Sequence, residues 1–537
     1  MALKPPGFAW LAVLPLAALL LLLMAPLLRL VLEGWGGVGQ AAPSLWQMWQ
    51  DDYLRWRVGW SVLQAAATCV AALALGLPVA WVLARFEFLG RALSLRLLML
   101  PFVVPTLVAA IGVLALWGPQ GLLAGLLGLD LQGTPWMLLY GNLFFNLCLV
   151  VRAGVEALER VSASQLAAAR SLGATPWRAF WRIEWPAIAP WLASSLCLVF
   201  LYCFAGFGLA LVLGGQRYAT VEVEIYTLVA HELKLAEASA LALAMLLLTG
   251  GVALLYAGLE RRLGVPARVE PVPRHAPRGL AQWLALAAAL AMLLLVCAAP
   301  LLAIVWRALM AGPAAWAELL AAETLAALWN TLRFSALALL LATFLGLAHA
   351  LSARAWLPWR AASYLPFVVS PVTVAFGLLL LYPSWTASLP LLLAAYALLA
   401  YPFVTQSLNA GLDSLPPQLA QASRTLGAGP WRTLWRVTLP LLRPALRRGM
   451  AFAAASAVGE FAVTLFLSRP EWATLSTLIY ERLGRPGAAN RDAAAAFARV
   501  PEQIRGFGHV KARHLVAARQ QWALLFEKYD QLQLARA

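Results

Sequence analysis

The sequence contains few charged side chains. Only 12% of its 537 residues are Asp, Glu, Lys or Arg, whereas 62% are apolar. Soluble globular domains carry about 25% charged residues, so the composition excludes an ordinary soluble protein. The chain is instead expected to cross a membrane many times.

Motifs for nucleotide or metal chemistry are also missing. The sequence has no G-x-x-x-x-G-K-[ST] loop for nucleotide phosphates, so ATP hydrolysis is expected on another chain. The five cysteines lie in apolar segments without the spacing of metal ligands, and we expect core residues rather than a disulfide or metal site. His349, alone in an apolar segment, is expected to pack between helices. No catalytic residue, metal or bound cofactor is predicted.

Long apolar segments recur along the chain. Each can cross a hydrocarbon layer of about 30 Å as a helix, which predicts an all-α polytopic membrane protein. Eleven such spans are expected, and the first is too long for a signal peptide and is expected to be retained. The predicted spans are 8–30, 59–84, 95–118, 135–156, 190–213, 238–260, 281–308, 329–353, 360–382, 386–408 and 446–469.

The net charge of +16 comes mainly from arginines in alternate loops. Basic loops remain in the cytoplasm, so the pattern places the N-terminus and the loops at 156–190 and 409–445 on the cytoplasmic side. The loop 214–237, which contains four glutamates, is expected outside. The basic residues do not gather on one face, so the lipid bilayer, and not a nucleic acid, is the expected partner.

A polar segment occurs twice. Residues 167–186 (AAARSLGATPWRAFWRIEWP, the first cassette) and 421–440 (QASRTLGAGPWRTLWRVTLP, the second cassette) are identical at 11 of 20 positions. The two are separated by 254 residues, the difference between Gly173 and Gly427. LPFVVPTLVAAIG at 100–112 is likewise repeated as LPFVVSPVTVAFG at 365–377, and these two proline-containing helices either pack inside the bundle or are ordinary kinked helices that line nothing.

The duplication predicts two halves. We expect a first half at 1–260, a linker at 261–280, a second half at 281–487 and a polar tail at 488–537. In each cassette the glycine predicts a helix, a sharp turn and a second helix at the membrane face. A single such loop is most simply an anchor at the membrane interface. Two matching copies instead favour a binding partner that is present in two copies.

The cassettes resemble the EAA loop of bacterial ABC-importer permeases. The matching positions are the small residues Ala168 and Ala422, the glycines Gly173 and Gly427, the apolar Ile183 and Val437, and the prolines Pro186 and Pro440. The chain departs from the family where Ala167 and Gln421 replace its glutamate.

This resemblance implies a function. It implies two pseudo-symmetric permease halves with twelve helices in a bacterial inner membrane. It also implies docking of both loops on two copies of a cytoplasmic ATPase, which binds ATP and Mg, and a periplasmic binding protein that delivers the solute.

Fusion of two halves is typical of importers for iron(III), thiamine and related solutes. The segments 117–129, 141–147, 182–186 and 201–215 are most similar to permeases of thiamine importers. Thiamine or its phosphates are therefore the expected substrate, with iron(III) or a polyamine as alternatives. An ion-coupled secondary transporter remains a further alternative, because such proteins also contain repeats around a central site.

Glu460 is the one acidic residue in the middle of a predicted span. An ionisable group at that depth predicts a functional site. Gly206 is its counterpart 254 residues earlier, and Phe204, Phe207 and Phe461 lie near the pair in sequence. Glu460 and these aromatic residues are expected to line the path of a cationic substrate. The alternative is a structural carboxylate bonded to helix hydroxyls or to Asn142 or Asn146.

The end of the chain lacks the expected twelfth span. Residues 488–537 are too polar to cross a bilayer. From about Val500 they resemble the C-terminal end of indolepyruvate:ferredoxin oxidoreductase enzymes, and a frame change or gene rearrangement is the simplest explanation. No oxidoreductase activity is inferred, because the segment has no cluster-binding cysteines.

Overall fold

The computed structural model describes residues 9–36, 49–119, 121–262, 270–310, 320–353 and 356–483. The predicted polar tail and its resemblance lie outside these residues. The chain divides into two compact units, Met1–Thr474 and Leu475–Ala537, and the described part of the second is the single helix α28 (Leu475–Leu483). The described residues form helices joined by short turns, with two isolated β-bridges.

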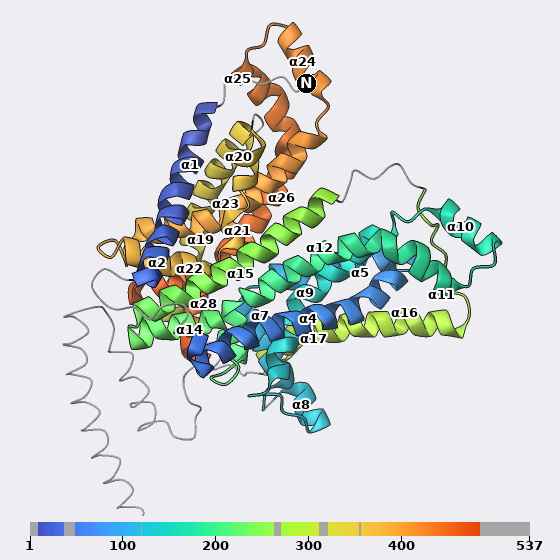
Figure 1. The fold of residues 1–537 in the computed structure, drawn as a ribbon, viewed down its shortest axis with the longest axis horizontal. Helices are drawn as coiled ribbons and strands as arrows, with labels where there is room; N and C mark the ends of the chain where they lie inside the picture. The colour runs from blue at the N-terminus through green and yellow to red at the C-terminus, as the bar shows by residue number, and fades with distance from the viewer. Residues whose placement is uncertain are drawn as a thin grey trace, which may run out of the picture. The chain divides into compact units, whose positions relative to one another are not determined.

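The helices before the linker begin with one long apolar segment, in which the π-helical residues Leu20–Met24 separate two α-helices. Figure 1 shows these helices in the colour order of the chain. They are α1 (Val13–Leu19), α2 (Ala25–Gly36), α4 (Asp52–Arg85), α5 (Arg91–Leu97), α6 (Leu100–Val103), α7 (Thr106–Trp117), α8 (Leu122–Leu127), α9 (Pro135–Leu158), α10 (Ala163–Ser171), α11 (Pro176–Ala179), α12 (Trp185–Phe204), α13 (Phe207–Leu213), α14 (Val221–Thr227) and α15 (Leu235–Arg262).

The helices after the linker repeat this order up to the counterpart of α13, except that α8 has no counterpart among them. They are α16 (Leu280–Leu293), α17 (Ala299–Met310), α19 (Ala322–Ser352), α20 (Leu357–Ala362), α21 (Leu365–Val368), α22 (Pro371–Leu381), α23 (Leu389–Ser414), α24 (Pro417–Thr425), α25 (Pro430–Thr433), α26 (Leu439–Val458) and α27 (Ala462–Leu467).

Nine helices of the described residues are long and apolar enough to span a membrane, and a pair bent by 93° at residues 369–370 makes a tenth. The predicted span 446–469 is not among them. Its helix, α26, carries Arg443, Arg447 and Arg448 in its first half and ends at Val458. Ten of the eleven predicted spans thus correspond to these helices, and the polytopic all-α class is confirmed.

Four of the predicted spans are broken near their middle. The breaks lie at 104–105, 205–206, 369–370 and 459–461, and they separate α6 from α7, α12 from α13, α21 from α22 and α26 from α27. Pro105 and Pro371 lack the amide hydrogen that a continuous helix needs, and glycines at 206 and 459 permit the other two bends. Backbone groups freed at such breaks are tolerated in a membrane only inside protein or beside a cavity.

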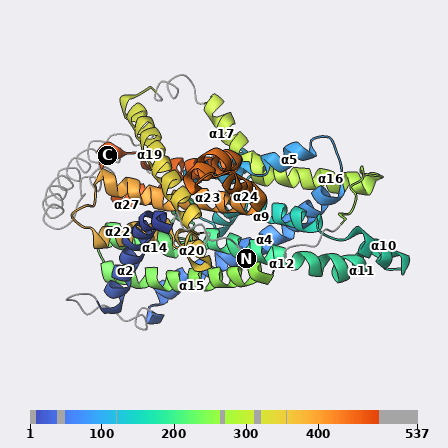
Figure 2. The ribbon, with the colours of Figure 1, turned by 90° about the horizontal axis from the view of Figure 1, so that it is seen from above.

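The first long helix of each half packs against the other half. The helix α2 lies beside α22, as Figures 1 and 2 both show, and α17 lies beside α7. Each contact places a glycine against a proline: a Cβ atom at Gly112 would lie 2.8 Å from the carbonyl oxygen of Pro300, and one at Gly377 would lie 2.9 Å from Cβ of Pro26. The helices of LPFVVPTLVAAIG and its repeat are thus packed inside the bundle.

The described part of the linker is attached to the first half. The backbone of His275 exchanges hydrogen bonds with Arg85 and Glu87, and the carbonyl of Glu270 accepts from the amide of Ala163 at 3.1 Å. Arg274 also donates to Glu159 at 2.8 Å. The linker therefore runs beside α10, which belongs to the first cassette.

Candidate functional site

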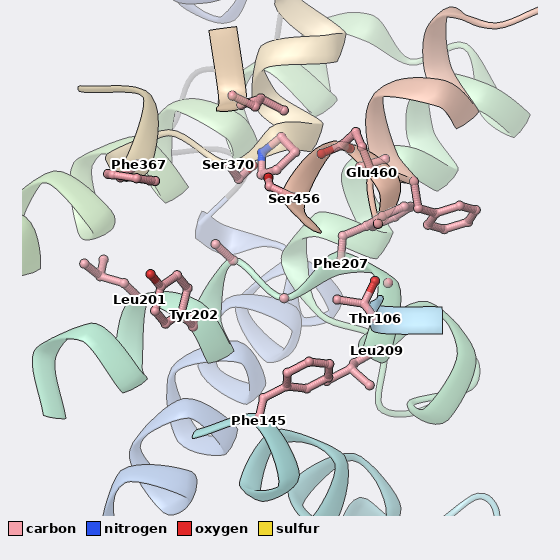
Figure 3. Close-up of a pocket in the computed structure, with 18 of the residues that line it drawn as sticks. Thr106, Phe145, Leu201, Tyr202, Phe207, Leu209, Phe367, Ser370, Ser456 and Glu460 are labelled. Carbon is pink, nitrogen blue, oxygen red and sulfur yellow. The ribbon is translucent and has the colours of Figure 1, made fainter. Parts of the chain in front are cut away.

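A cavity of about 340 Å³ lies where the four helix breaks meet. All four breaks contribute to its wall, together with α9, α15 and α23. In Figure 3, Phe367, Ser370, Ser456 and Glu460 of the second half lie on one side, and Phe145, Leu201, Tyr202 and Phe207 of the first half lie on the other. The helices of LPFVVPTLVAAIG and its repeat therefore line a cavity, which excludes the alternative that they line nothing.

The two halves meet at a pair of equivalent phenylalanines. Phe207 begins α13 and Phe461 stands just before α27, and their positions differ by the repeat period of 254. Their rings stack with centroids 5.8 Å apart and planes 20° apart. Both rings line the cavity. Equivalent residues of the two pseudo-symmetric halves thus meet in the cavity wall.

Glu460 lines the cavity from the break between α26 and α27. Its side chain is partly buried, and Oε1 accepts a hydrogen bond from the amide of Val463 at 3.1 Å, which caps the start of α27. Asn142 instead donates to Gln64, and Asn146 donates to the carbonyl of Asn142. One carboxylate oxygen therefore has a structural partner, and the carboxylate still faces the cavity.

Phe204 is placed differently from the other predicted residues of the path. Its side chain is fully buried, stacks on Phe200 within α12, and does not line the cavity. Leu201, Tyr202 and Ala205 form the cavity face of that helix, and Phe204 points away from the centre of this face.

Sequence reasoning missed most of the polar and aromatic wall. Tyr202 and Ser456 are counterparts at a separation of 254 residues, and both line the cavity. Phe367 and Ser370 belong to the segment LPFVVSPVTVAFG, so the repeat itself was the signal that could have located them. The cavity is therefore apolar and aromatic, with a few hydroxyl and amide groups and one lining carboxylate. Such a wall can bind a small organic cation.

The two cassettes have the predicted helix, turn and helix. In the first, the amide of Gly173 donates to Arg170 at 3.0 Å and that of Ala174 donates to Ala169 at 3.0 Å. In the second, Gly427 and Ala428 repeat both bonds at 2.9 and 3.1 Å. This pattern is a Schellman turn, and the φ angles of +80° and +78° at the two glycines explain why glycine stands there.

The outer surface of each cassette is apolar as well as basic. Leu172 and Leu426, beside the turn glycines, are each 88% exposed. Trp177, Trp181, Trp431 and Trp435 are also exposed. Of the predicted coupling positions, Ala168 and Ala422 lie on exposed helix faces, while Pro186 and Pro440 stand in the first turns of α12 and α26.

The cassettes differ in how they are attached. Glu184, at the end of the first cassette, forms a buried ion pair with Arg85 of α4. The equivalent position of the second cassette is Thr438, 254 residues later, so this ion pair has no equivalent there. A hydrogen bond of 3.0 Å between the hydroxyls of Ser423 and Thr433 joins its two helices instead.

Each cassette leads directly into a helix that ends at the cavity. The helices α12 and α26 each contain 20 residues, so each extends for about 30 Å. One end carries the cassette, and the other end carries a break that lines the cavity. Each of these helices thus connects its cassette with the cavity wall.

The remaining residues singled out from the sequence are packed. His349 is fully buried, stacks on Trp359 at 4.1 Å, and its Nε2 lies 2.8 Å from the carbonyl of that residue. All five cysteines are unpaired, and four of them are buried.

Comparisons with known proteins agree with this architecture. The family model of the binding-protein-dependent transport system inner membrane component matches residues 72–265 and 338–483. The thiamine transport system permease protein ThiP of Escherichia coli K12 is 28% identical over 456 residues, which are 81% of this chain and 85% of that protein. ThiP of Brucella abortus 2308 is 30% identical over 494 residues, 88% of this chain and 89% of that protein.

A solved bacterial ABC transporter for the acidic polysaccharide alginate aligns with 48% of this chain and 96% of its own, with 17% identity and a TM-score of 0.41. The relatives are named as inner membrane components and permease proteins of transport systems that depend on a binding protein, not as enzymes. The chain belongs to the family of binding-protein-dependent transport system inner membrane components and is a multi-pass permease subunit of an ABC importer, with both permease halves in one polypeptide.

Proposed function

We propose that this permease imports thiamine or its phosphates by alternating access around the cavity. The observation that carries the proposal is the composition of the wall: one lining carboxylate, Glu460, stands among aromatic rings at the junction of the halves. A thiazolium ring is a flat cation, which a carboxylate attracts and which aromatic faces also stabilise. The ThiP relatives support the same substrate.

Two copies of a cytoplasmic ATPase are proposed to drive the cycle, one at each cassette. The predicted contact residues are Ala168, Gly173, Pro186, Ala422, Gly427 and Pro440. The exposed Leu172 and Leu426 add an apolar contact at each turn. ATP and Mg are bound by those partner subunits. Their closure moves both cassettes, and α12 and α26 carry the movement to Phe207 and Glu460.

The cassettes are proposed to face the cytoplasm. Trp10, near the start of the described chain, has its ring 6.3 Å from that of Trp431 in the second cassette. The N-terminus is therefore assigned to the same side as the second cassette. The periplasmic binding protein would deliver the solute at the opposite side.

Uptake by proteoliposomes tests the proposal. The complete complex should accumulate labelled thiamine only with ATP on the cassette side of the membrane and with the ATPase present. Uptake of iron(III) or a polyamine in place of thiamine would assign another substrate. Uptake that follows an ion gradient without ATP would contradict the proposed mechanism.

The variant Glu460→Gln tests the role of the cavity. Glutamine keeps the oxygen that accepts from Val463, so the cap of α27 remains while the charge is removed. We expect thiamine uptake to fall by at least tenfold, because a charge about 4 Å from a cation contributes several kcal/mol at an effective dielectric constant of about 20. Glu156→Gln removes a half-exposed charge on α9 and serves as the matched control. Unchanged uptake by Glu460→Gln would contradict the role of Glu460.

A further inference from the structure

A second buried carboxylate stands directly behind the cavity wall. Glu222 of α14 is 0% exposed. Among the described residues, neither oxygen of its carboxylate has a hydrogen-bond partner. Burial, and to a lesser extent the like charge of Glu460, raise the pKa of Glu222 to about 8, and the hydroxyl of Ser370 and the backbone amide of Phe207 offset this only in part. Ser370, Phe207 and Glu460 all line the cavity.

The orientation of α14 separates its two glutamates. Glu224 forms an ion pair with Arg57 at 3.2 Å and accepts from Tyr53 at 2.8 Å. Glu222 shares the opposite face with Tyr226, one helical turn later. The ring of Tyr226 lies 5.6 Å from Phe207 and 5.4 Å from Phe466 of α27. Glu222 is thus on the side of α14 that faces the junction of the two halves.

An unpaired carboxylate in this position is unfavourable by itself. Burial of a charge without a partner costs free energy, so Glu222 holds its proton at neutral pH until an approaching cation favours the charged form. Glu224 has its cation within the protein, whereas Glu222 has none among the described residues. The cavity on the other side of Ser370 and Phe207 is the space in which a cation can come close to it.

We propose that Glu222 is a second anionic residue of the transport site, which acts with Glu460 to hold the positive ring of an organic cation between the halves. This inference rests on the proposed function. Glu460 contacts the solute from the wall, and Glu222 attracts it from behind Ser370 and Phe207. Two carboxylates favour a cation over a neutral molecule of the same shape more strongly than one does.

The test compares two substrates of equal shape. Proteoliposomes with the full complex and saturating loaded binding protein are supplied either with thiamine or with its neutral isostere, in which a thiophene replaces the thiazolium ring. For Glu222→Gln we expect the ratio of thiamine uptake to isostere uptake to fall by about tenfold, as for one charge at about 10 Å in a protein interior. Glu222→Asp keeps the charge but draws it back from the cavity, so it should lower the ratio measurably but by less than Glu222→Gln does. Glu156→Gln should not change the ratio.

Each outcome is decisive. If the uptake of both substrates falls equally in Glu222→Gln, the residue is only structural, and the inference is wrong. If Glu222→Gln behaves as wild type, the native group keeps its proton even when the cation is bound, and the inference is also wrong. If Glu222→Gln does not assemble with the ATPase, the ratio in Glu222→Asp decides, because displacement of the charge must still alter it. Failure of the wild type to take up thiamine would instead contradict the proposed function.

Discussion

At the scale of single residues, glycine determines the form of both cassettes. Gly173 and Gly427 adopt left-handed backbone angles, which other residues reach only with strain. The neighbouring leucines are thereby held outward at 88% exposure, where a partner can cover them. The family glutamate is missing at Ala167 and Gln421, so turn geometry and apolar contact carry more of the expected docking here.

Substitution of the turn glycines should weaken docking. We expect Gly173→Ala and Gly427→Ala each to cost about 1–2 kcal/mol in the turn, because alanine is strained at positive φ. The recovered ATPase should fall accordingly when the complex is isolated through this chain. Gly429→Ala is the matched control, since Gly429 has a φ of −65° and a Cβ atom there would have no other atom within 4 Å. Equal recovery from Gly427→Ala and Gly429→Ala would exclude a role for the turn.

At the scale of helices, the breaks in four helices form the site. A continuous helix satisfies its own backbone and offers only side chains to a solute. The breaks at 104–105, 205–206, 369–370 and 459–461 bend four helices around one cavity and bring Phe207 against Phe461. Close packing of α2 on α22 and of α17 on α7 holds the bent helices in place.

The two glycine and proline contacts between helices should be sensitive to a single methyl group. Gly112→Ala and Gly377→Ala place Cβ within 3 Å of Pro300 and Pro26, so we expect a loss of about 1–3 kcal/mol in stability from overpacking. Thermal unfolding in detergent measures the loss. Gly59→Ala, in the open part of α4, should not lower the melting temperature, because alanine is the better helix former there. A similar melting temperature for all three variants would contradict the packing argument.

At the scale of the whole molecule, the halves are held together by more than the linker. The first long helix of each half packs against the other half. The linker itself is hydrogen-bonded to the first half through the backbone of Glu270 and His275. Duplication therefore produced an interlocked pair that shares one cavity. The attachment is unequal, because only the first cassette has the buried pair of Arg85 and Glu184.

Separate expression of the halves tests this interlocking. We expect chains 1–266 and 267–537, produced together, to purify as a complex, because the exchanged helices bury apolar surface between them. Omitting 267–279 from the second chain should reduce recovery, since the bonds of Glu270 and His275 to the first half are lost. Recovery of either chain alone at the same yield would show that the exchanged helices do not join the halves.

The membrane class, the duplication and the form of the cassettes followed from the sequence alone, because hydropathy, repetition and the glycine turn are local properties of the chain. Glu460, Phe207 and Phe461 were located for the same reason: an acid in an apolar span stands out, and the period of 254 residues gives its counterparts. Only the tertiary structure decided that Phe204 lies outside the cavity and that four spans are broken. It alone also showed that the first long helix of each half packs against the other half. It also showed that Glu222, predicted in an outer loop, is buried beside Ser370, because the burial of a side chain depends on contacts between segments that are far apart in the chain.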